Sequence, residues 1–320
     1  MTASPPTRTR RSVLKTTGGL LAVGGLLGSA GSATAVEEWT TAETPTARTL
    51  HDVVETAAGA YAVGGGGDVL HRTDAGWVRV LNGGPTGNGN DLYGAAATDD
   101  GTRLWLVGAS GAIGEYDVLT GSLTDHSAPD DVTNNFNDVS VVGEAGEANV
   151  YIAGDSGKIY RSFDNGATGT WDQITPGSGS AIHAIDFHGP RSGHAVDGNQ
   201  TVFETTDGTV YQKIGIADAN VNFYALDSDA TDSVSVAGGG GMVHRWDGAR
   251  WTPTDLGDAS LRDIEVANGT GYVVGSGGVL FALGNGGWTQ AATPTGANLK
   301  AVRRGDTDIA VGASGTVIEK

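Results

Sequence analysis

The chain has 320 residues, of which 53 are Gly, 9 are Pro and none is Cys. The absence of Cys excludes disulfides, thiol catalysis, iron–sulfur clusters and thiolate zinc sites. Residues 1–35 hold four of the 19 basic residues and none of the 37 acidic ones, so the remainder has a formal net charge of −22. Such a surface repels nucleic acid and anionic lipid, and we expect neither as a partner.

The first predicted element is an export signal at residues 1–35. Arg10 and Arg11, followed by apolar residues and Lys15, resemble the twin-arginine motif. The run from Gly18 to Gly31 is mildly apolar and too short for a good membrane span. The alternative is a basic, disordered N-terminus.

Small residues then mark a cleavage site. Ala33 and Ala35 occupy the two positions that signal peptidase reads. We therefore expect residues 36–320 to be the mature protein, without a stable membrane span. The twin-arginine pathway exports folded proteins, so we expect it to be secreted or held at the cell surface. The acid-rich, Lys-poor composition resembles that of salt-adapted proteins of the haloarchaeal type; an ordinary acidic secreted protein is the alternative.

One turn sequence organises the rest of the chain. Val311-Gly312-Ala313-Ser314-Gly315 has six sister copies, each between two apolar runs. The residues that follow the first apolar run are Gly64, Gly108, Gly154, Asp197, Gly238, Gly275 and Gly312, at intervals of 37 to 46 residues. Periods near 40 built only from strand-like segments are typical of a β-propeller. We interpret the turn as a two-residue hairpin, in which Gly supplies the positive φ.

Each repeat contains the four strands of a propeller blade. The first, innermost strands are Leu50–Val54, Leu92–Ala96, Phe136–Val142, Ile182–Phe187, Phe223–Leu226, Leu261–Val266 and Leu299–Val302. A second strand ends at the Gly turn and a third follows it. A fourth strand begins with an aromatic residue at Trp77, Trp171, Tyr211, Trp251 and Trp288. The sequence thus predicts an all-β protein with seven four-stranded antiparallel blades.

The two ends of the repeat region predict how the ring closes. Residues 37–46 are similar to residues 286–295, which form the fourth strand of the sixth repeat. The seventh repeat stops at Lys320 after three strands. We therefore expect the N-terminal strand to complete the C-terminal blade, so that no blade is left with an open edge.

A family resemblance emerges in the third repeat. Ser162-Phe163-Asp164-Asn165-Gly166-Ala167-Thr168, with Trp171 beyond it, resembles the Asp-box of sialidase-like propellers, although two residues are inserted before the Trp. Degenerate copies follow Thr73, Thr206 and Trp246. Together with the repeated turn, the mature chain resembles the BNR-repeat (WD40/YVTN/BNR-like) propellers related to photosystem II assembly and stability factors. We interpret the Asp of the box as a turn residue that bonds to its own backbone rather than as a catalytic group.

No catalytic or metal-binding motif is apparent. A sialidase of this fold needs three Arg around a carboxylate, a Tyr/Glu nucleophile pair and an acidic proton donor. Tyr93 and Tyr224 lie on inner strands, but neither has an evident Glu partner. No Gly-rich turn leads into a helix, which argues against a phosphate loop. His51 and His183 occupy equivalent positions and could face each other, but we predict no metal and no cofactor.

The second residue of each inner strand is the candidate binding position. Around the ring it is His51, Tyr93, Asn137, His183, Tyr224, Arg262 and Lys300, each polar or aromatic. Because inner strands begin at one mouth of the channel, these residues should form a ring there. Arg262, Lys300 and His51 come from consecutive blades, and Arg48, Arg303 and Arg304 are near them in sequence. The alternative is a solvated rim that balances nearby acids.

These features favour an exported, non-enzymatic propeller that acts as a protein-binding or assembly scaffold. Its partner would be a protein segment or a carboxylate-bearing ligand at one channel mouth, held by Arg262, Lys300 and His51. The alternatives are a glycan-active or glycan-binding sialidase-like propeller and a purely structural component of the cell surface. Oligomeric state is left open.

Overall fold

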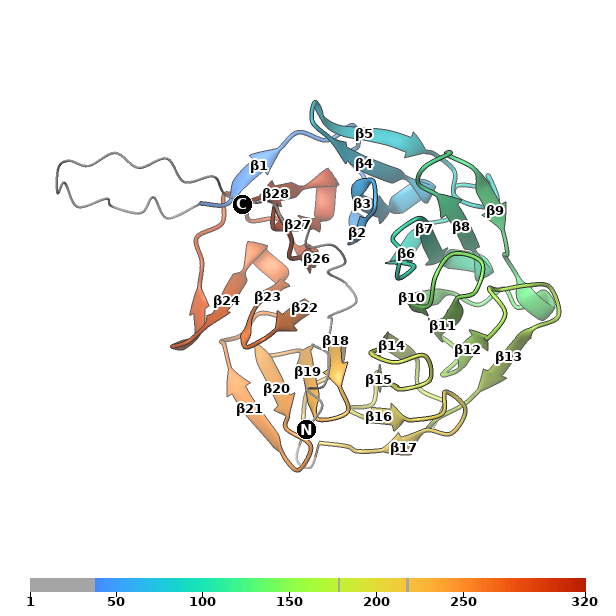
Figure 1. Ribbon diagram of the computed structural model, residues 1–320. Coiled ribbons are helices and arrows are strands. Elements are labelled where there is room, and N and C mark those ends of the chain that lie inside the picture. Colours follow the sequence, from blue (N-terminus) through green and yellow to red (C-terminus); the bar gives the residue numbers. More distant parts are fainter. Residues whose placement is uncertain (1–37, 178, 217–218) are drawn as a thin grey trace, which may run out of the picture.

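Seven antiparallel sheets of four strands each surround a central axis in the computed structural model, which describes residues 38–177, 179–216 and 219–320 (Figure 1). Each sheet is one blade, and its strands follow in chain order from the axis outward, except in the last blade. The predicted seven-bladed propeller is therefore confirmed. Within the described residues, no helix has the length and apolarity needed to cross a bilayer.

The strands are short and evenly distributed. Blades 1 to 3 contain β2 (Leu50–Thr56), β3 (Gly59–Gly64), β4 (Val69–Thr73), β5 (Gly76–Leu81), β6 (Leu92–Ala97), β7 (Arg103–Gly108), β8 (Ile113–Asp117), β9 (Leu123–Asp125), β10 (Phe136–Val142), β11 (Asn149–Gly154), β12 (Ile159–Ser162) and β13 (Trp171–Ile174). Blades 4 to 6 contain β14 (Ile182–Phe187), β15 (Gly193–Asp197), β16 (Val202–Thr205), β17 (Gln212–Lys213), β18 (Phe223–Ala230), β19 (Ser233–Gly238), β20 (Met242–Trp246), β21 (Trp251–Asp255), β22 (Leu261–Ala267), β23 (Thr270–Gly275), β24 (Leu280–Gly284) and β25 (Gly287–Gln290). Blade 7 contains β26 (Leu299–Arg303), β27 (Ile309–Gly312), β28 (Val317–Glu319) and β1 (Thr40–Ala42).

The ring closes as predicted, with the N-terminal strand completing the C-terminal blade. Strand β1 pairs antiparallel with β28, with Thr40 opposite Glu319 and Ala42 opposite Val317. Just before β1, Trp39 is only 6% exposed, and its ring contacts the ring of Tyr272 edge-on at 5.4 Å between centroids. The N-terminal strand is therefore held both by backbone hydrogen bonds and by a buried aromatic side chain.

The carboxylate of Glu319 joins the last blade to the first. The Arg72 guanidinium on β4 donates to both of its oxygens, at 2.9 and 3.1 Å, and Trp77 Nε1 on β5 donates to Oε1 at 2.8 Å. A bidentate Arg–carboxylate pair is among the stronger and more directional side-chain interactions. The third strand of blade 7 is thus fastened to the third and fourth strands of blade 1.

The repeated Gly turn has the predicted two-residue form. In blade 7 the N–H of Thr316 donates to the carbonyl of Ala313 at 3.1 Å, and the two residues between them, Ser314 and Gly315, have φ of 59° and 71°. The same pair of positive φ values recurs in blades 1, 2 and 6, and two central residues with positive φ are typical of a type I′ turn. The Gly before the turn has extended backbone, and is required because a Cβ on Gly312 would lie 2.2 Å from the carbonyl oxygen of Asn298.

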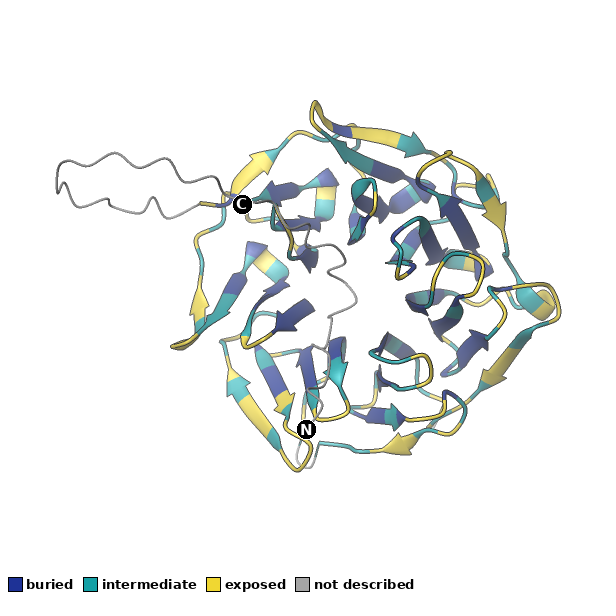
Figure 2. Cartoon of the chain, viewed as in Figure 1, coloured by how far each residue is buried: buried dark blue, intermediate teal, exposed yellow. Residues whose placement is uncertain are grey.

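The hydrophobic core lies between neighbouring blades. Inner and middle strands are buried and outer strands are exposed (Figure 2). The cluster between blades 3 and 4 is representative: Tyr151 and Phe187 stack with centroids 3.6 Å apart. Two neighbouring blades bury these flat aromatic surfaces against each other, and their removal from water holds successive blades face to face.

Carboxylates on the inner strands connect the blades. Each accepts a backbone N–H from the next blade along the chain, at 2.8 to 3.1 Å. The pairs are Asp52 with Ala95, Asp138 with Ile185, Asp186 with Ser228, Asp227 with Val266, Asp263 with Val302 and Glu265 with Arg304. A hydrogen bond to a charged group contributes about 1.5 to 3 kcal/mol. These acids therefore stabilise the ring rather than only charging its surface.

The Asp-box turns differ in which side chain bonds the backbone. At two of the three degenerate copies, Asp207 and Asp247 accept backbone N–H groups from residues two and three positions later, as expected. In the fuller copy, Ser162 Oγ accepts the N–H of Asp164 and Gly166, whereas the exposed Asp164 carboxylate accepts no hydrogen bond from a described residue. Asp164 is a turn residue as predicted, since its carbonyl accepts from Ala167 N at 2.9 Å, but the predicted bond from its side chain to the backbone is not made.

Candidate functional site

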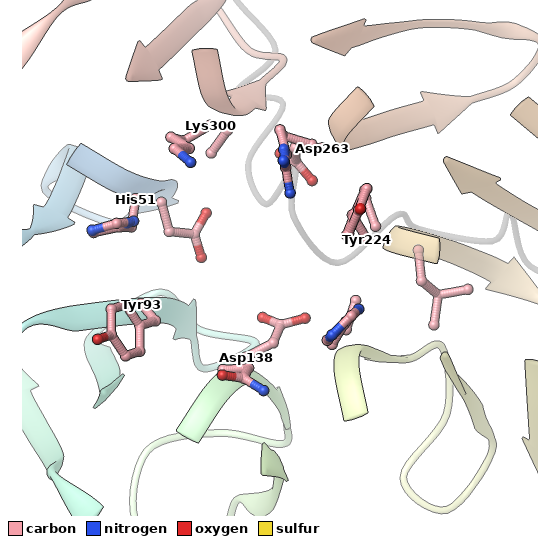
Figure 3. A pocket seen from close by; sticks show the side chains of 14 residues that line it. His51, Tyr93, Asp138, Tyr224, Asp263 and Lys300 are labelled. Atoms are coloured by element: carbon pink, nitrogen blue, oxygen red, sulfur yellow. The ribbon is translucent and has the colours of Figure 1, made fainter. Parts of the chain in front are cut away.

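All seven predicted ring residues line one hollow at the centre of the propeller. The hollow has an empty volume of about 380 Å³, including space open to solvent. Figure 3 shows His51, Tyr93, Tyr224 and Lys300 projecting around it from different blades. The other predicted members, Asn137, His183 and Arg262, complete the lining with buried Asp, Ala and Leu residues beneath them.

A β-bulge places each of these side chains. In every blade the pairing of the inner strand with its neighbour skips the second residue, for example between Leu50 and Asp52 and between Leu261 and Asp263. The skipped residues are the ring residues His51, Tyr93, Asn137, His183, Tyr224, Arg262 and Lys300. A bulged residue is released from the pleat and can re-aim its side chain. The seven side chains therefore point to the axis while the residues after them return to the core.

Two ring side chains bond to the next blade. Asn137 Nδ2 donates to the carbonyl of Ile182 at 2.9 Å, and His183 Nδ1 lies 2.7 Å from the carbonyl of Phe223. Each carbonyl belongs to the residue just before the next ring residue. This half of the ring is consequently fixed by hydrogen bonds, and His183 presents its Nδ1 as a donor.

The other half is aromatic and cationic. The ring of His51 contacts Tyr93 edge-on at 5.3 Å, and the guanidinium of Arg262 lies 4.2 Å from the centroid of Tyr224. Among the described residues, neither Arg262 nor Lys300 forms an ion pair with a carboxylate, and each is partly exposed. These two cations are thus available to an anionic group in the hollow.

Burial and mutual repulsion lower the pKa values of Lys300 and His51 in this half of the ring. Burial, and then the charge of Arg262, lowers the pKa of Lys300. Burial, and then the charge of Lys300, lowers the pKa of His51, while Asp91 acts in the opposite direction. An anion in the hollow would offset the repulsion, since opposite charges favour the charged form.

The acids that line the hollow were not predicted as part of it. Asp52, Asp138 and Asp263 are each 7% exposed and follow a bulged residue directly. Their carboxylates accept backbone N–H groups from the next blade, so they face the wall and not the solvent. The recurrence of Asp after the ring residue in blades 1, 3 and 6 was the available signal.

The three other arginines near the ring in sequence lie elsewhere. Arg48 pairs with buried Asp68, and Arg303 pairs with Glu55 and is only 3% exposed. Arg304 donates to the carbonyl and hydroxyl oxygens of Thr270. Their side chains are committed to structural contacts, so they do not enlarge the cationic group.

The described lining of the hollow lacks the arginine set of a sialidase site. Arg262 is the one arginine among the described residues that line the hollow, whereas a sialidase site needs three. His183 bonds to Phe223 and stacks with Tyr224, and His51 packs on Tyr93, so the two histidines are held by different neighbours. In the part of the chain that the structure describes, no three His, Asp or Glu side chains are grouped to hold a metal ion.

No family model matches the chain, and no curated protein matches its sequence. Solved structures match over most of it. A structure of YCF48 bound to D1 peptide is 14% identical, with a TM-score of 0.71, over 90% of this chain and 98% of that one. YCF48 from Cyanidioschyzon merolae is 16% identical, with a TM-score of 0.69, over 88% and 98%. Virginiamycin B lyase from Staphylococcus aureus is 12% identical, with a TM-score of 0.74, over 88% and 97%. Likeness at this identity shows the fold alone, and the fold hosts both binding proteins and enzymes.

Proposed function

We propose that the protein is a non-enzymatic binding or assembly propeller that holds a protein segment by an anionic group at the central hollow. The observation that carries the proposal is the adjacency of Arg262 and Lys300, two cations without a carboxylate partner among the described residues. They face a hollow whose acids are already committed to backbone N–H groups. The aromatic faces of Tyr93 and Tyr224 beside them suit the side chains or backbone of an extended peptide.

The structural neighbours support this class of function without deciding it. YCF48 has been captured with a peptide, and the WD40 propeller of Doa1 matches with a TM-score of 0.66 at 13% identity. We further propose that the chain is related to the BNR-repeat assembly factors. In that case the relatives would keep the β-bulge of the inner strand, and the identity of the bulged ring residue would differ from one relative to another.

Replacing Arg262 and Lys300 together by Ala is expected to weaken peptide binding by about a hundredfold or more, because charged hydrogen bonds contribute about 1.5 to 3 kcal/mol each and about 1.4 kcal/mol corresponds to a tenfold change. The probe is a set of extended peptides with a Glu or a free C-terminal carboxylate, and their Gln or amidated counterparts. Binding is measured by fluorescence anisotropy at fixed salt. The control is Arg250→Ala, since Arg250 is exposed on the outside of blade 5 and pairs with Asp247.

Equal binding by the double variant and the wild type would overturn the proposal, as would equal binding of carboxylate and amidated peptides. The thermal melt of the double variant must match that of the wild type. A matched melt shows that lost binding reflects the missing cations and not a disturbed ring.

We further propose that residues 1–35, which lie outside the described residues, direct export of the folded protein through the twin-arginine pathway to the cell surface or medium. Replacing Arg10 and Arg11 by Lys should abolish export and leave precursor inside the cell, since the Arg pair is the recognised feature. Immunoblots of cell and medium fractions measure the export. N-terminal sequencing of the exported wild-type protein should give Val36 as its first residue. Continued export of the double variant would contradict the pathway.

A further inference from the structure

Three ring side chains form a continuous stack along one side of the central hollow. The guanidinium of Arg262 lies 4.2 Å from the centroid of the Tyr224 ring. The ring of His183 is stacked on Tyr224, with centroids 5.7 Å apart and 23° between the planes. The three residues come from blades 4, 5 and 6, and Tyr224 belongs to the middle blade. Tyr224 therefore has one stacking partner in each adjacent blade.

The imidazole end of this stack is fixed to the backbone. His183 Nδ1 donates to the carbonyl of Phe223 at 2.7 Å, and Phe223 is the residue just before Tyr224. Gly198 closes the space beside the imidazole, since a Cβ there would lie 3.1 Å from Cε1 of His183. The stack is thus anchored at one end, and the guanidinium of Arg262 lies on its other end without any ligand in the hollow.

Lys300 has no such support. It lines the same hollow as Arg262, but among the described residues its ammonium group makes no hydrogen bond, ion pair or cation–π contact. A lysine carries a point charge on a flexible stem, whereas a guanidinium presents a planar fork of donors that matches a carboxylate through two parallel hydrogen bonds. The two cations therefore differ in kind: one is held in place and the other is free to move.

Holding an arginine in advance favours binding, because a mobile side chain has to be immobilised by its ligand. Immobilisation of one long side chain weakens binding by about three- to tenfold. A cation over the face of a Tyr ring is attracted to that ring before the ligand arrives. The charge that attracts an anion from a distance is the same in either case, so the advantage lies in the lifetime of the complex.

We propose that Tyr224 positions Arg262 to hold one carboxylate of the partner through two parallel hydrogen bonds, while Lys300 supplies charge without fixing the geometry. The inference rests on the function proposed above and identifies the anionic group as a planar carboxylate. That carboxylate belongs either to an acidic side chain or to the C-terminus of the partner. Tyr224 is a positioning residue, since it acts through Arg262.

A double-mutant cycle tests this role. The proteins are the wild type, Tyr224→Leu, Arg262→Ala and the variant with both changes. The probes are an amidated peptide with a Glu and a Glu-free peptide with a free C-terminal carboxylate, which separate the two sources. Tyr224→Leu should raise the dissociation rate about three- to tenfold and change the association rate by less than about twofold, because the net charge is kept.

Two further comparisons complete the cycle. Tyr224→Phe retains the aromatic face and should dissociate like the wild type, and Tyr224→Leu should have no further effect once Arg262 is Ala. Tyr93→Leu is the matched control, because Tyr93 contacts His51 and not Arg262. Its effect should be the same with and without Arg262. Dissociation rates report only on folded, bound protein, so a lower Tm in a variant does not imitate the result.

Two outcomes would refute the inference while the proposed function stands. One is an unchanged dissociation rate in Tyr224→Leu although the Arg262 and Lys300 double variant has lost binding. The other is an equal effect of Tyr224→Leu with and without Arg262, which would mean that the Tyr224 ring contacts the partner itself. If the double variant bound like the wild type, the proposed function and this inference would fail together.

Discussion

Removal of Val36–Pro45 is expected to lower the Tm by roughly 10 °C or more. The deletion removes β1, its pairing with β28 and the buried side chain of Trp39. Loss of a buried Trp alone costs about 3 to 5 kcal/mol, and each kcal/mol shifts the Tm of a domain this large by about 2 to 4 °C. The open edge of β28 would also invite aggregation. Thermal unfolding followed by circular dichroism measures the shift.

Two companions sharpen this experiment. A protein that lacks only residues 1–35 should melt like the intact chain, because the closing strand is retained. Addition of a synthetic peptide of residues 36–45 to the truncated ring should recover part of the Tm, since a ligand that binds the folded state stabilises it. An unchanged melt after the deletion would sink the proposed role of the N-terminal strand.

Acidification from pH 7 to pH 5 is expected to destabilise the protein by about 2 kcal/mol through His194 alone. Burial, and then the charge of His188, lowers the pKa of His194 from 6.5 to about 3. Between those two values the unfolded chain binds a proton that the folded protein does not. Stability is therefore complete above pH 6.5 and falls by about 1.4 kcal/mol per unit until about pH 3. Urea unfolding at a series of pH values measures the slope.

The variant His194→Asn isolates this contribution. Its side chain can still bond to Ser228 Oγ, which lies 2.7 Å from Nδ1 of His194, but it does not titrate. The difference in unfolding free energy between wild type and variant should be constant above pH 7 and should change by about 2 kcal/mol by pH 5. His244 and His51, whose pKa values burial also lowers, act in both proteins and cancel. A difference that does not change with pH would contradict the assignment.

Periodicity was enough to predict the architecture, since each repeat carries its own strands and turn. The similarity of residues 37–46 to residues 286–295 also predicted how the ring closes, because it showed a fourth strand without a blade. The role of the first Gly in the repeated motif was not predictable in the same way. It serves a close approach to a distant carbonyl, as at Gly312 and Asn298, and sequence does not reveal that contact.

The ring residues were predicted as a group, but not the bulge that aims them. A polar residue that follows an apolar one reads as an ordinary exposed position in a strand, and only the register shows that His51 or Arg262 is skipped. The acids posed a different difficulty. A carboxylate such as Asp138 bonds to a backbone N–H 47 residues later, and every residue except Pro offers such a group. The net charge alone therefore suggested salt adaptation, which stays a prediction. The structure shows that part of this negative charge belongs to carboxylates that join the blades.

The carboxylates that join the blades also impose an order in time. Asp52, Asp138, Asp186, Asp227, Asp263 and Glu265 all accept from residues 39 to 47 positions later, so each bond waits for the following blade. During synthesis from the N-terminus, blades can be joined one after another behind the growing end. The exception is the last junction, where Glu319 must meet Arg72 and β28 must meet β1. A newly made chain would therefore remain an open arc until β28 and Glu319 have left the ribosome, and only then become a ring.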